Sequence, residues 1–142
     1  MGGTLVYSGD SIRLRRITAG FLLLFACATV VWWVIVLTSD AALALFLPQE
    51  LPQLWLHGFI AADAIVYCGT AVAAAVGLWK ARAWAWGCLC AHAGAAAYVA
   101  LVCGTMSLLT DSAWWSVALM SPCAVSAAWF TWQLYPSRRR NT

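Results

Sequence analysis

Long apolar stretches separated by short polar connections dominate the pattern of this sequence. Four of them, at residues 17–38, 54–79, 83–109 and 113–135, each contain close to the roughly 20 residues that a helix needs to cross a bilayer. The short connections leave no room for a second domain. We therefore expect residues 1–142 to form one all-α domain, an integral membrane four-helix transmembrane bundle with up-down-up-down topology.

The composition agrees with a membrane location. Hydrophobic residues make up 64% of the chain and charged residues 9%, whereas soluble domains contain about 25% charged residues. The net charge of +3 does not indicate a nucleic-acid partner, because every basic residue lies beside the end of an apolar stretch. The expected partner is the lipid bilayer, and no nucleic acid is expected.

Charged residues and tryptophans predict the same orientation. The eight basic residues fall in three clusters, at Arg13 to Arg16, Lys80 to Arg82 and Arg138 to Arg140, on one side. The acidic residues Asp40, Glu50 and Asp111 fall on the other side. The positive-inside rule then places both termini in the cytoplasm, and we expect the membrane to be a bacterial cytoplasmic membrane. Tryptophans that mark the outer boundary are Trp55, Trp114 and Trp115, and those at the inner boundary are Trp79, Trp84, Trp86, Trp129 and Trp132.

The connections predict local structure as well. The apolar piece Ala41 to Leu47 is too short to span, so we expect it to lie at the interface or to cap the bundle. Pro52 suits the first turn of the second span, and either Thr110 or Asp111 is a suitable cap for the fourth.

Small residues recur at helical spacing on two neighbouring spans. Gly69, Ala73 and Gly77 do so on the second span, and Gly87, Ala91 and Ala95 on the third. Close backbone approach is a main source of association between helices in lipid. The spacing therefore predicts a tight antiparallel pair of these two spans.

Asp63 is the residue that most needs an explanation. It lies well inside the second apolar stretch, where a charge costs about 2.5–3.5 kcal/mol on insertion scales. Tyr67 and Thr70 follow it at i+4 and i+7, on one face of a helix. We expect this polar face to point into the bundle, sheltered from lipid.

Depth along the spans predicts which residues surround Asp63. It follows Trp55 by eight residues, roughly 12 Å along a helix, and Pro122 follows Trp114 by the same number. An outer-half chamber bounded by Asp63, Trp33, Tyr98, Ser121 and Pro122 is therefore expected. The candidate ligand-binding residues are Asp63, Tyr67, Trp33, Tyr98, Ser121 and His92.

Cofactor chemistry is not indicated. His57 and His92 differ in depth by roughly 15 Å across a core about 30 Å thick, so they cannot both ligate one haem iron. Cys88 and Cys90 point to nearly opposite faces of a helix, which disfavours a dithiol centre. No group of ligands shares one face, so no zinc or other metal is expected either. All six cysteines are expected to be packing residues.

Several functions remain open at this point. Asp63 in an apolar pocket suits a ligand cation, or charge that develops during isomerisation or cyclisation of a lipid, and it is the candidate catalytic residue. Alternatively, Asp63 is structural, hydrogen-bonded to Tyr98 or Ser121 between helices. The chain can also be an accessory subunit of a larger membrane complex, or a homo-oligomer. A small transporter or proton relay is a further alternative, although the series Asp63, Tyr67, Thr70 and His92 stops short of the cytoplasmic side.

A family resemblance adds to the ligand-binding interpretation. Trp55 followed eight residues later by Asp63, the basic turn at Lys80, His92 and Pro122 are the residues that carry it. In these the chain resembles the EXPERA group of four-helix membrane proteins, which includes the sigma-2 receptor and emopamil-binding protein. The resemblance implies a pocket for sterol-like or cationic amphiphilic ligands, lined by Asp63, and in some members a sterol double-bond isomerase.

Overall fold

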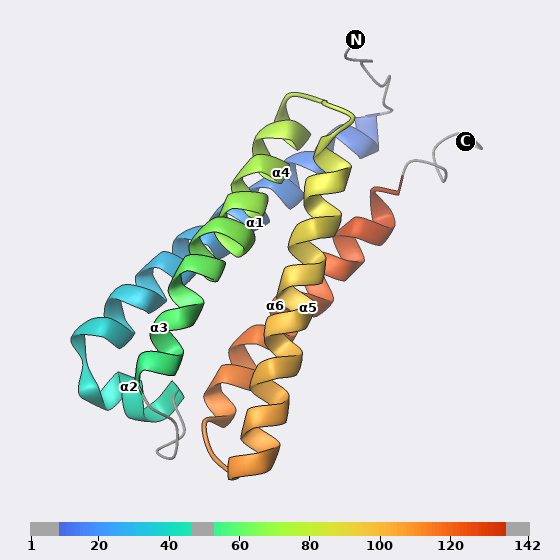
Figure 1. Ribbon diagram of the computed structural model, residues 1–142. Coiled ribbons are helices and arrows are strands. Elements are labelled where there is room, and N and C mark those ends of the chain that lie inside the picture. The colour runs from blue at the N-terminus through green and yellow to red at the C-terminus, as the bar shows by residue number, and fades with distance from the viewer. Residues whose placement is uncertain (1–8, 47–52, 136–142) are drawn as a thin grey trace.

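The chain is helical throughout the residues that the structure, a computed structural model, describes, namely 9–46 and 53–135, apart from short turns. Its elements are α1 (Gly9–Thr38), α2 (Asp40–Phe46), α3 (Gln53–Ala62), the π-helix η1 (Asp63–Cys68), α4 (Gly69–Trp79), α5 (Ala85–Thr110) and α6 (Trp114–Gln133) (Figure 1). Helices α3, η1 and α4 follow one another without a break and form one long rod. The expected all-α class is confirmed.

Three helical stretches are long and apolar enough to cross a membrane, namely Ile12–Thr38, His57–Trp79 and Ala85–Thr110. The chain is therefore a multi-pass membrane protein. Helix α6 has 20 residues but is less apolar, because four tryptophans, three serines and a glutamine interrupt it. The expectation of a fourth span at 113–135 thus receives support from length and packing only.

The long helices pack in the order α1, α4, α5, α6. In Figure 1, α1 and the α3–η1–α4 rod lie on one side of the molecule and α5 with α6 on the other. The two sides meet beside the α4–α5 turn, and α3 and α5 stand apart at the opposite end, which α2 occupies. We call these two ends of the molecule the turn end and the α2 end.

Small and medium apolar side chains fill the core near the turn end. The α4 side chains that pack there between helices α1 and α5 are Ala71, Ala74, Ala75 and Leu78. From α5, Ala85 and Leu89 enter the same core. This half of the molecule is solid packing.

The α4–α5 turn depends on a glycine. A Cβ at Gly77 would lie 2.7 Å from the Cβ of Ala85 and 2.8 Å from the ring of Trp84, closer than real Cβ contacts. The amide of Arg82 donates to the Gly77 carbonyl over 2.9 Å. Ala81 adopts a left-handed conformation with φ 58°, which allows so short a turn. The backbone of the turn can therefore pack directly on Gly77.

Only part of the expected small-residue pairing occurs. Gly77 is buried against α5, but Gly87 and Ala91 are exposed, and a Cβ at Gly87 would have nothing within 4 Å. The buried residues of α5 include Ala85, Leu89, His92 and Ala96 at i, i+4, i+7 and i+11. This stripe lies about 200° around the helix from Gly87 and Ala91, at about 100° per residue. The prediction is therefore wrong for Gly87 and Ala91, whereas Ala95 packs against the cluster that contains Tyr67.

The caps also differ from expectation. Helix α6 begins after Ala113, which has φ 56° and provides no side-chain cap, so neither Thr110 nor Asp111 caps it. Asp111 instead ends α5 in a left-handed conformation and accepts the indole N–H of Trp114 over 3.3 Å. Thr110 bonds the Met106 carbonyl within its own helix.

Some expectations concern residues that the structure does not describe. Glu50, Pro48, Pro52 and Arg138 to Arg140 lie outside the described residues. The side chain of Trp55 is likewise not described. The expected interfacial piece, by contrast, is described and forms α2, where the Ala42 amide donates to the Ser39 hydroxyl over 3.3 Å.

Candidate functional site: an apolar cavity beside Asp63

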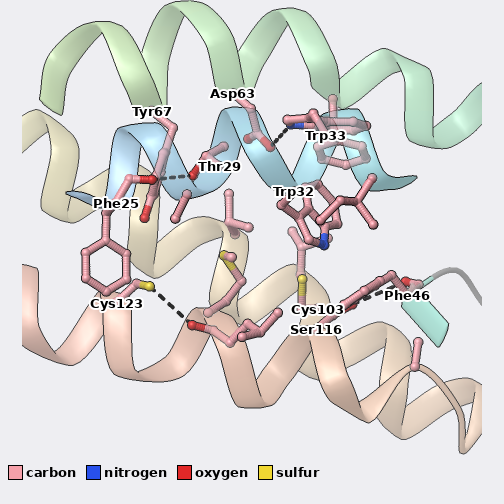
Figure 2. A pocket seen from close by; sticks show the side chains of 18 of the residues that line it. Phe25, Thr29, Trp32, Trp33, Phe46, Asp63, Tyr67, Cys103, Ser116 and Cys123 are labelled. Atoms are coloured by element: carbon pink, nitrogen blue, oxygen red, sulfur yellow. Dashed lines mark hydrogen bonds between the residues drawn. The ribbon is translucent and has the colours of Figure 1, made fainter. Parts of the chain in front are cut away.

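A cavity of about 390 Å³, here called the central cavity, lies between the two sides of the molecule toward the α2 end (Figure 2). Helices α1, α2, α3, η1, α5 and α6 all contribute to its wall. Most of its lining is aliphatic or aromatic. The lining residues are Phe25, Ala28, Thr29, Val31, Trp32, Trp33, Ile35, Phe46, Phe59, Asp63, Tyr67, Val99, Val102, Cys103, Met106, Ser107, Ala113, Ser116, Leu119, Met120 and Cys123.

Asp63 is the single acidic residue in this lining. Its carboxylate oxygen Oδ2 accepts a hydrogen bond of 3.0 Å from the indole N–H of Trp33 on α1, as Figure 2 shows. Trp33 is buried and Asp63 is partly buried. The bond links α1 to the rod formed by α3, η1 and α4, and it gives the intramembrane carboxyl a partner inside the protein.

Asp63 is also the first residue of η1, a π-helical turn inside the second span. Here the amide of Gly69 donates to the Ala64 carbonyl, five residues back. The hydroxyl of Thr70 donates to the carbonyls of Val66 and Tyr67. Such turns are rare and occur frequently at functional sites. In this chain the π-helical turn lies where the α3–η1–α4 rod borders the cavity.

His92 supports the same turn from behind. Its Nδ1 lies 3.2 Å from the Tyr67 carbonyl, and the two rings are 4.6 Å apart between centroids. Because a carbonyl only accepts, this contact requires the proton on Nδ1. His92 is 1% exposed and is not part of the cavity lining. Its position indicates a supporting role.

Tyr67 extends from η1 into the end of the cavity that lies toward the turn end of the molecule, where Ala96 and Ala127 pack against it. The residue is 3% exposed, and its hydroxyl has no hydrogen-bond partner within the described ranges 9–46 and 53–135. The hydroxyl interacts with the Cys123 thiol, which is a weak acceptor, so no oxygen or nitrogen acceptor among the described residues takes its proton. That thiol itself lies 3.2 Å from the Leu119 carbonyl.

Two further polar atoms in the lining lack a partner among the described residues, the indole N–H of Trp32 and the hydroxyl of Ser107. Trp32 packs edge-on against Trp33 and Phe46, with ring centroids 4.7 and 5.6 Å away. Figure 2 shows its indole nitrogen directed toward Cys103 across the cavity. Ser107 is 1% exposed.

Helix α2 closes one end of the cavity. Phe46 at its last position lines the cavity and packs with Trp32 and Trp33. The hydroxyl of Ser116 on α6 donates to the Phe46 carbonyl over 3.2 Å. The short connecting helix is thereby joined to both sides of the molecule.

A second, more open hollow of about 690 Å³, here called the lateral groove, lies between α3–η1 and α5. Gly58, Ala62, Ala91 and Ala95 are among its small lining residues. It shares four residues with the central cavity, Phe59, Asp63, Tyr67 and Val99. The wall between groove and cavity is thus one side chain thick.

The structure brings together three of the six residues expected at the site. Trp33, Asp63 and Tyr67 line the central cavity, whereas Tyr98 is 62% exposed and lines only the lateral groove. Ser121 lines neither hollow. Pro122, expected as a boundary, is exposed on α6. The sequence argument placed all these residues at a similar depth in the membrane. It did not determine which way each side chain points around its helix, and Tyr98 and Ser121 point away from the cavity.

Sequence reasoning missed Trp32, Ser107 and Ser116 as lining residues, and it did not place Phe46 of α2 in the lining. Trp32 adjoins Trp33, so the tryptophan pair is the signal that could have identified it. Ser107 and Ser116 are isolated polar residues near the ends of their spans and carry no periodic signal.

The buried polar side chains described in the turn-end half, Arg15 and Thr18, bond backbone carbonyls there. Beyond His92 the core consists of residues such as Ala74, Ala75 and Leu89. Among the described residues, no three His, Cys, Asp or Glu side chains come together as metal ligands. The chemistry available at the site is that of an apolar cavity with one carboxyl and a few neutral polar groups.

These features define the chain as a helical multi-pass membrane protein with an apolar cavity between its helices. No family model, curated protein or solved structure matches it. The resemblance to the EXPERA group therefore stays a prediction.

Proposed function

We propose that this protein binds an apolar or amphiphilic small molecule in the central cavity, beside Asp63. The observation that carries the proposal is the cavity itself, about 390 Å³ of space between the helices with a mostly apolar wall. Ligand pockets commonly have volumes of about 300–1,000 Å³, apolar walls and a few polar groups that fix orientation. Asp63 and its neighbours supply such groups here.

The proposal includes a four-helix transmembrane bundle with α6 as the fourth span. Twenty residues of helix extend about 30 Å, the thickness of the hydrocarbon core. Helix α6 packs along the full span α5. Exposed tryptophans stand near its two ends, Trp114 and Trp115 at one and Trp129 and Trp132 at the other, as expected of interfacial anchors.

The charges support an orientation with both termini in the cytoplasm. Arg13, Arg16, Lys80 and Arg82 belong to the turn end, and Asp111 belongs to the α2 end (Figure 1). The positive-inside rule assigns the turn end to the cytoplasm. The cavity then lies in the outer half of a cytoplasmic membrane, and its ligand is a molecule dissolved in or delivered to that leaflet.

The lateral groove gives such a ligand a route from the bilayer. It faces outward between α3–η1 and α5 and adjoins the cavity at Asp63 and Tyr67. A molecule that enters from the groove would pass the side chains of this shared wall. Isomerisation or cyclisation of the bound molecule at Asp63 is a catalytic form of the same proposal, with one acid–base group available.

Two neighbouring positions on α5 allow a direct test. Cys103 lines the cavity, whereas Leu101 is 71% exposed on the outer surface. We expect wild-type protein, purified in detergent and analysed by native mass spectrometry, to carry an apolar small molecule. Cys103→Trp, which fills the cavity, should lower its amount at least about tenfold, a loss of about 1.4 kcal/mol of binding. Leu101→Trp should retain it, and equal retention by both variants would contradict the proposal.

The other functions receive less support. An accessory subunit would use an outward small-residue surface such as Gly87 and Ala91, but Asp63 and Tyr67 point inward, toward the cavity. A transporter or relay needs polar groups that continue across the membrane, and the packed alanine and leucine core near the turn end lies in their path.

A further inference from the structure

Three neutral polar groups in the lining of the central cavity are buried without a partner among the described residues. They are the indole N–H of Trp32 and the hydroxyls of Tyr67 and Ser107. Tyr67 and Ser107 are 3% and 1% exposed. Native proteins satisfy the great majority of their buried polar groups, so an unpartnered one in a cavity wall indicates a missing partner.

The chemistry of these groups defines that partner. An indole N–H can only donate, and a tyrosine or serine hydroxyl can donate as well. Asp63, the one carboxyl in the lining, already accepts the Trp33 indole N–H through Oδ2. All three groups can thus donate to a ligand, the two hydroxyls can also accept, and the lining contains no basic residue.

The three donors are distributed along the cavity. Tyr67 packs with Ala96 and Ala127 at the end of the cavity toward the turn end. Trp32 packs with Phe46 at the end toward α2. Apolar surface fills the space between them. A bound molecule thus meets hydrogen-bond donors at its ends and hydrocarbon or aromatic surface along its body.

We infer that the ligand of the central cavity is an uncharged apolar molecule with a carbonyl-type oxygen, which accepts hydrogen bonds from Trp32, Tyr67 or Ser107. The inference rests on the proposed function and specifies its ligand class. In this arrangement Asp63 fixes the wall through Trp33, and the donors recognise the ligand. A cationic amphiphile would instead use Asp63 as its counter-charge and leave the three donors unpaired.

Three probes of one shape distinguish these cases. They are 2-acetylnaphthalene, with a carbonyl acceptor, 2-ethylnaphthalene, without one, and 2-(aminomethyl)naphthalene, a cation at neutral pH. Binding is measured by ligand-observed NMR titration of the full chain in lipid nanodiscs, with empty nanodiscs subtracted. We expect the ketone to bind about tenfold more tightly than the hydrocarbon, since hydrogen bonds contribute about 0.5–1.5 kcal/mol each.

Substitutions of the donors connect the preference to the site. Trp32→Phe, Tyr67→Phe and Ser107→Ala each remove one donor and keep an apolar wall. At least one should lower ketone affinity about threefold to tenfold, while hydrocarbon affinity changes less than about twofold. The matched controls Trp115→Phe, Tyr98→Phe and Ser126→Ala remove the same groups outside the cavity and should change neither. Thermal unfolding of each variant shows that it is folded.

The outcomes separate this inference from the proposed function. Equal binding of ketone and hydrocarbon overturns the ligand class and leaves a binding cavity in place. Tightest binding of the amine, lost in Asp63→Asn, overturns it in favour of a cationic ligand. Absence of ketone binding also overturns it. The proposed function is judged separately, by the molecule that copurifies with wild type and is lost in Cys103→Trp.

Discussion

The indole N–H of Trp33 donates to Oδ2 of Asp63 over 3.0 Å, and this bond links α1 to the first residue of the π-helical turn η1. The two residues are thirty positions apart in the sequence. Trp33 is buried by Val36 and its aromatic neighbours, so the donor is held in place by packing. The pair therefore fixes both the carboxyl and the wall of the central cavity.

The first prediction separates the hydrogen bond from the charge. Asp63→Asn keeps an acceptor oxygen for Trp33, whereas Trp33→Phe removes the donor and leaves the carboxyl without it. We expect Trp33→Phe to lower the free energy of unfolding by about 1–3 kcal/mol, and Asp63→Asn by less than about 1 kcal/mol. Reversible unfolding of the purified protein in mixed micelles measures both values. A larger loss for Asp63→Asn would show that the charge itself stabilises the fold.

Much of this site is accessible from the sequence. Asp63 is costly in a membrane unless it is sheltered, and that argument alone places it inside the protein. Tyr67 follows at helical spacing, and the depth of Trp33 along the first span indicates its place. All three line the cavity.

The rest depends on packing that a single sequence does not reveal. Depth gives no direction around the helix, so the expectation that Tyr98 and Ser121 line the cavity is wrong, because they face elsewhere. No sequence pattern in this chain predicts the π-helical turn that begins at Asp63. The turn nevertheless changes which residues of the α3–η1–α4 rod face the cavity. Helix α2 is expected at the membrane interface or as a cap of the bundle, and its contact with Ser116 and the position of Phe46 in the lining show that it closes one end of the cavity.

The second prediction concerns the cost of the unpartnered donors. A buried hydroxyl without a partner destabilises the folded state, and its removal is neutral or favourable. Tyr67→Phe and Ser107→Ala should therefore leave the free energy of unfolding unchanged or raise it by up to about 1 kcal/mol in ligand-free protein. Thermal unfolding of delipidated protein tests this. A clear destabilisation by either variant would mean that the hydroxyl has a partner in the folded protein.

The third prediction uses two glycines that differ in their surroundings. A methyl group at Gly77 would lie 2.7 Å from the Cβ of Ala85, whereas one at Gly87 would meet nothing within 4 Å. Gly77→Ala should lower the free energy of unfolding by about 1–3 kcal/mol, because overpacking forces the α4–α5 turn to shift. Gly87→Ala should be neutral or slightly stabilising, since alanine favours the helix. Chemical unfolding in mixed micelles compares the two, and equal stability would contradict the close packing at Gly77.

The fourth prediction concerns Arg15, which is 6% exposed and donates to the Leu78 carbonyl near the end of α4. A cation at a helix C-terminus also interacts favourably with the helix dipole. Arg15→Met should lower the free energy of unfolding by about 1–3 kcal/mol, the typical cost of a lost hydrogen bond to a charged group. Arg13 is exposed two residues earlier, and Arg13→Met should change stability by less than about 0.5 kcal/mol. Similar losses for the two would indicate that only total charge matters.

The last prediction tests the route of the ligand. Gly58 lines the lateral groove and is exposed, and a methyl group added there would meet nothing within 4 Å. Gly87 has the same freedom away from the groove. Gly58→Trp should place a large ring over the passage beside Asp63 and slow both association and dissociation of a cavity ligand at least about threefold. Its equilibrium affinity should change little, because the cavity lining is intact and a barrier alters both rates alike.

Stopped-flow fluorescence with 2-acetylnaphthalene in nanodiscs measures these rates, and Gly87→Trp is the control that adds the same ring to α5. The groove adjoins the cavity at Phe59, Asp63, Tyr67 and Val99, so a ring placed there obstructs the path through this shared wall. Unchanged rates in Gly58→Trp would exclude the lateral groove as the entrance. In that case the ligand enters elsewhere, such as between α1 and α6, where the exposed side chains of Val31, Ile35 and Leu119 line the cavity.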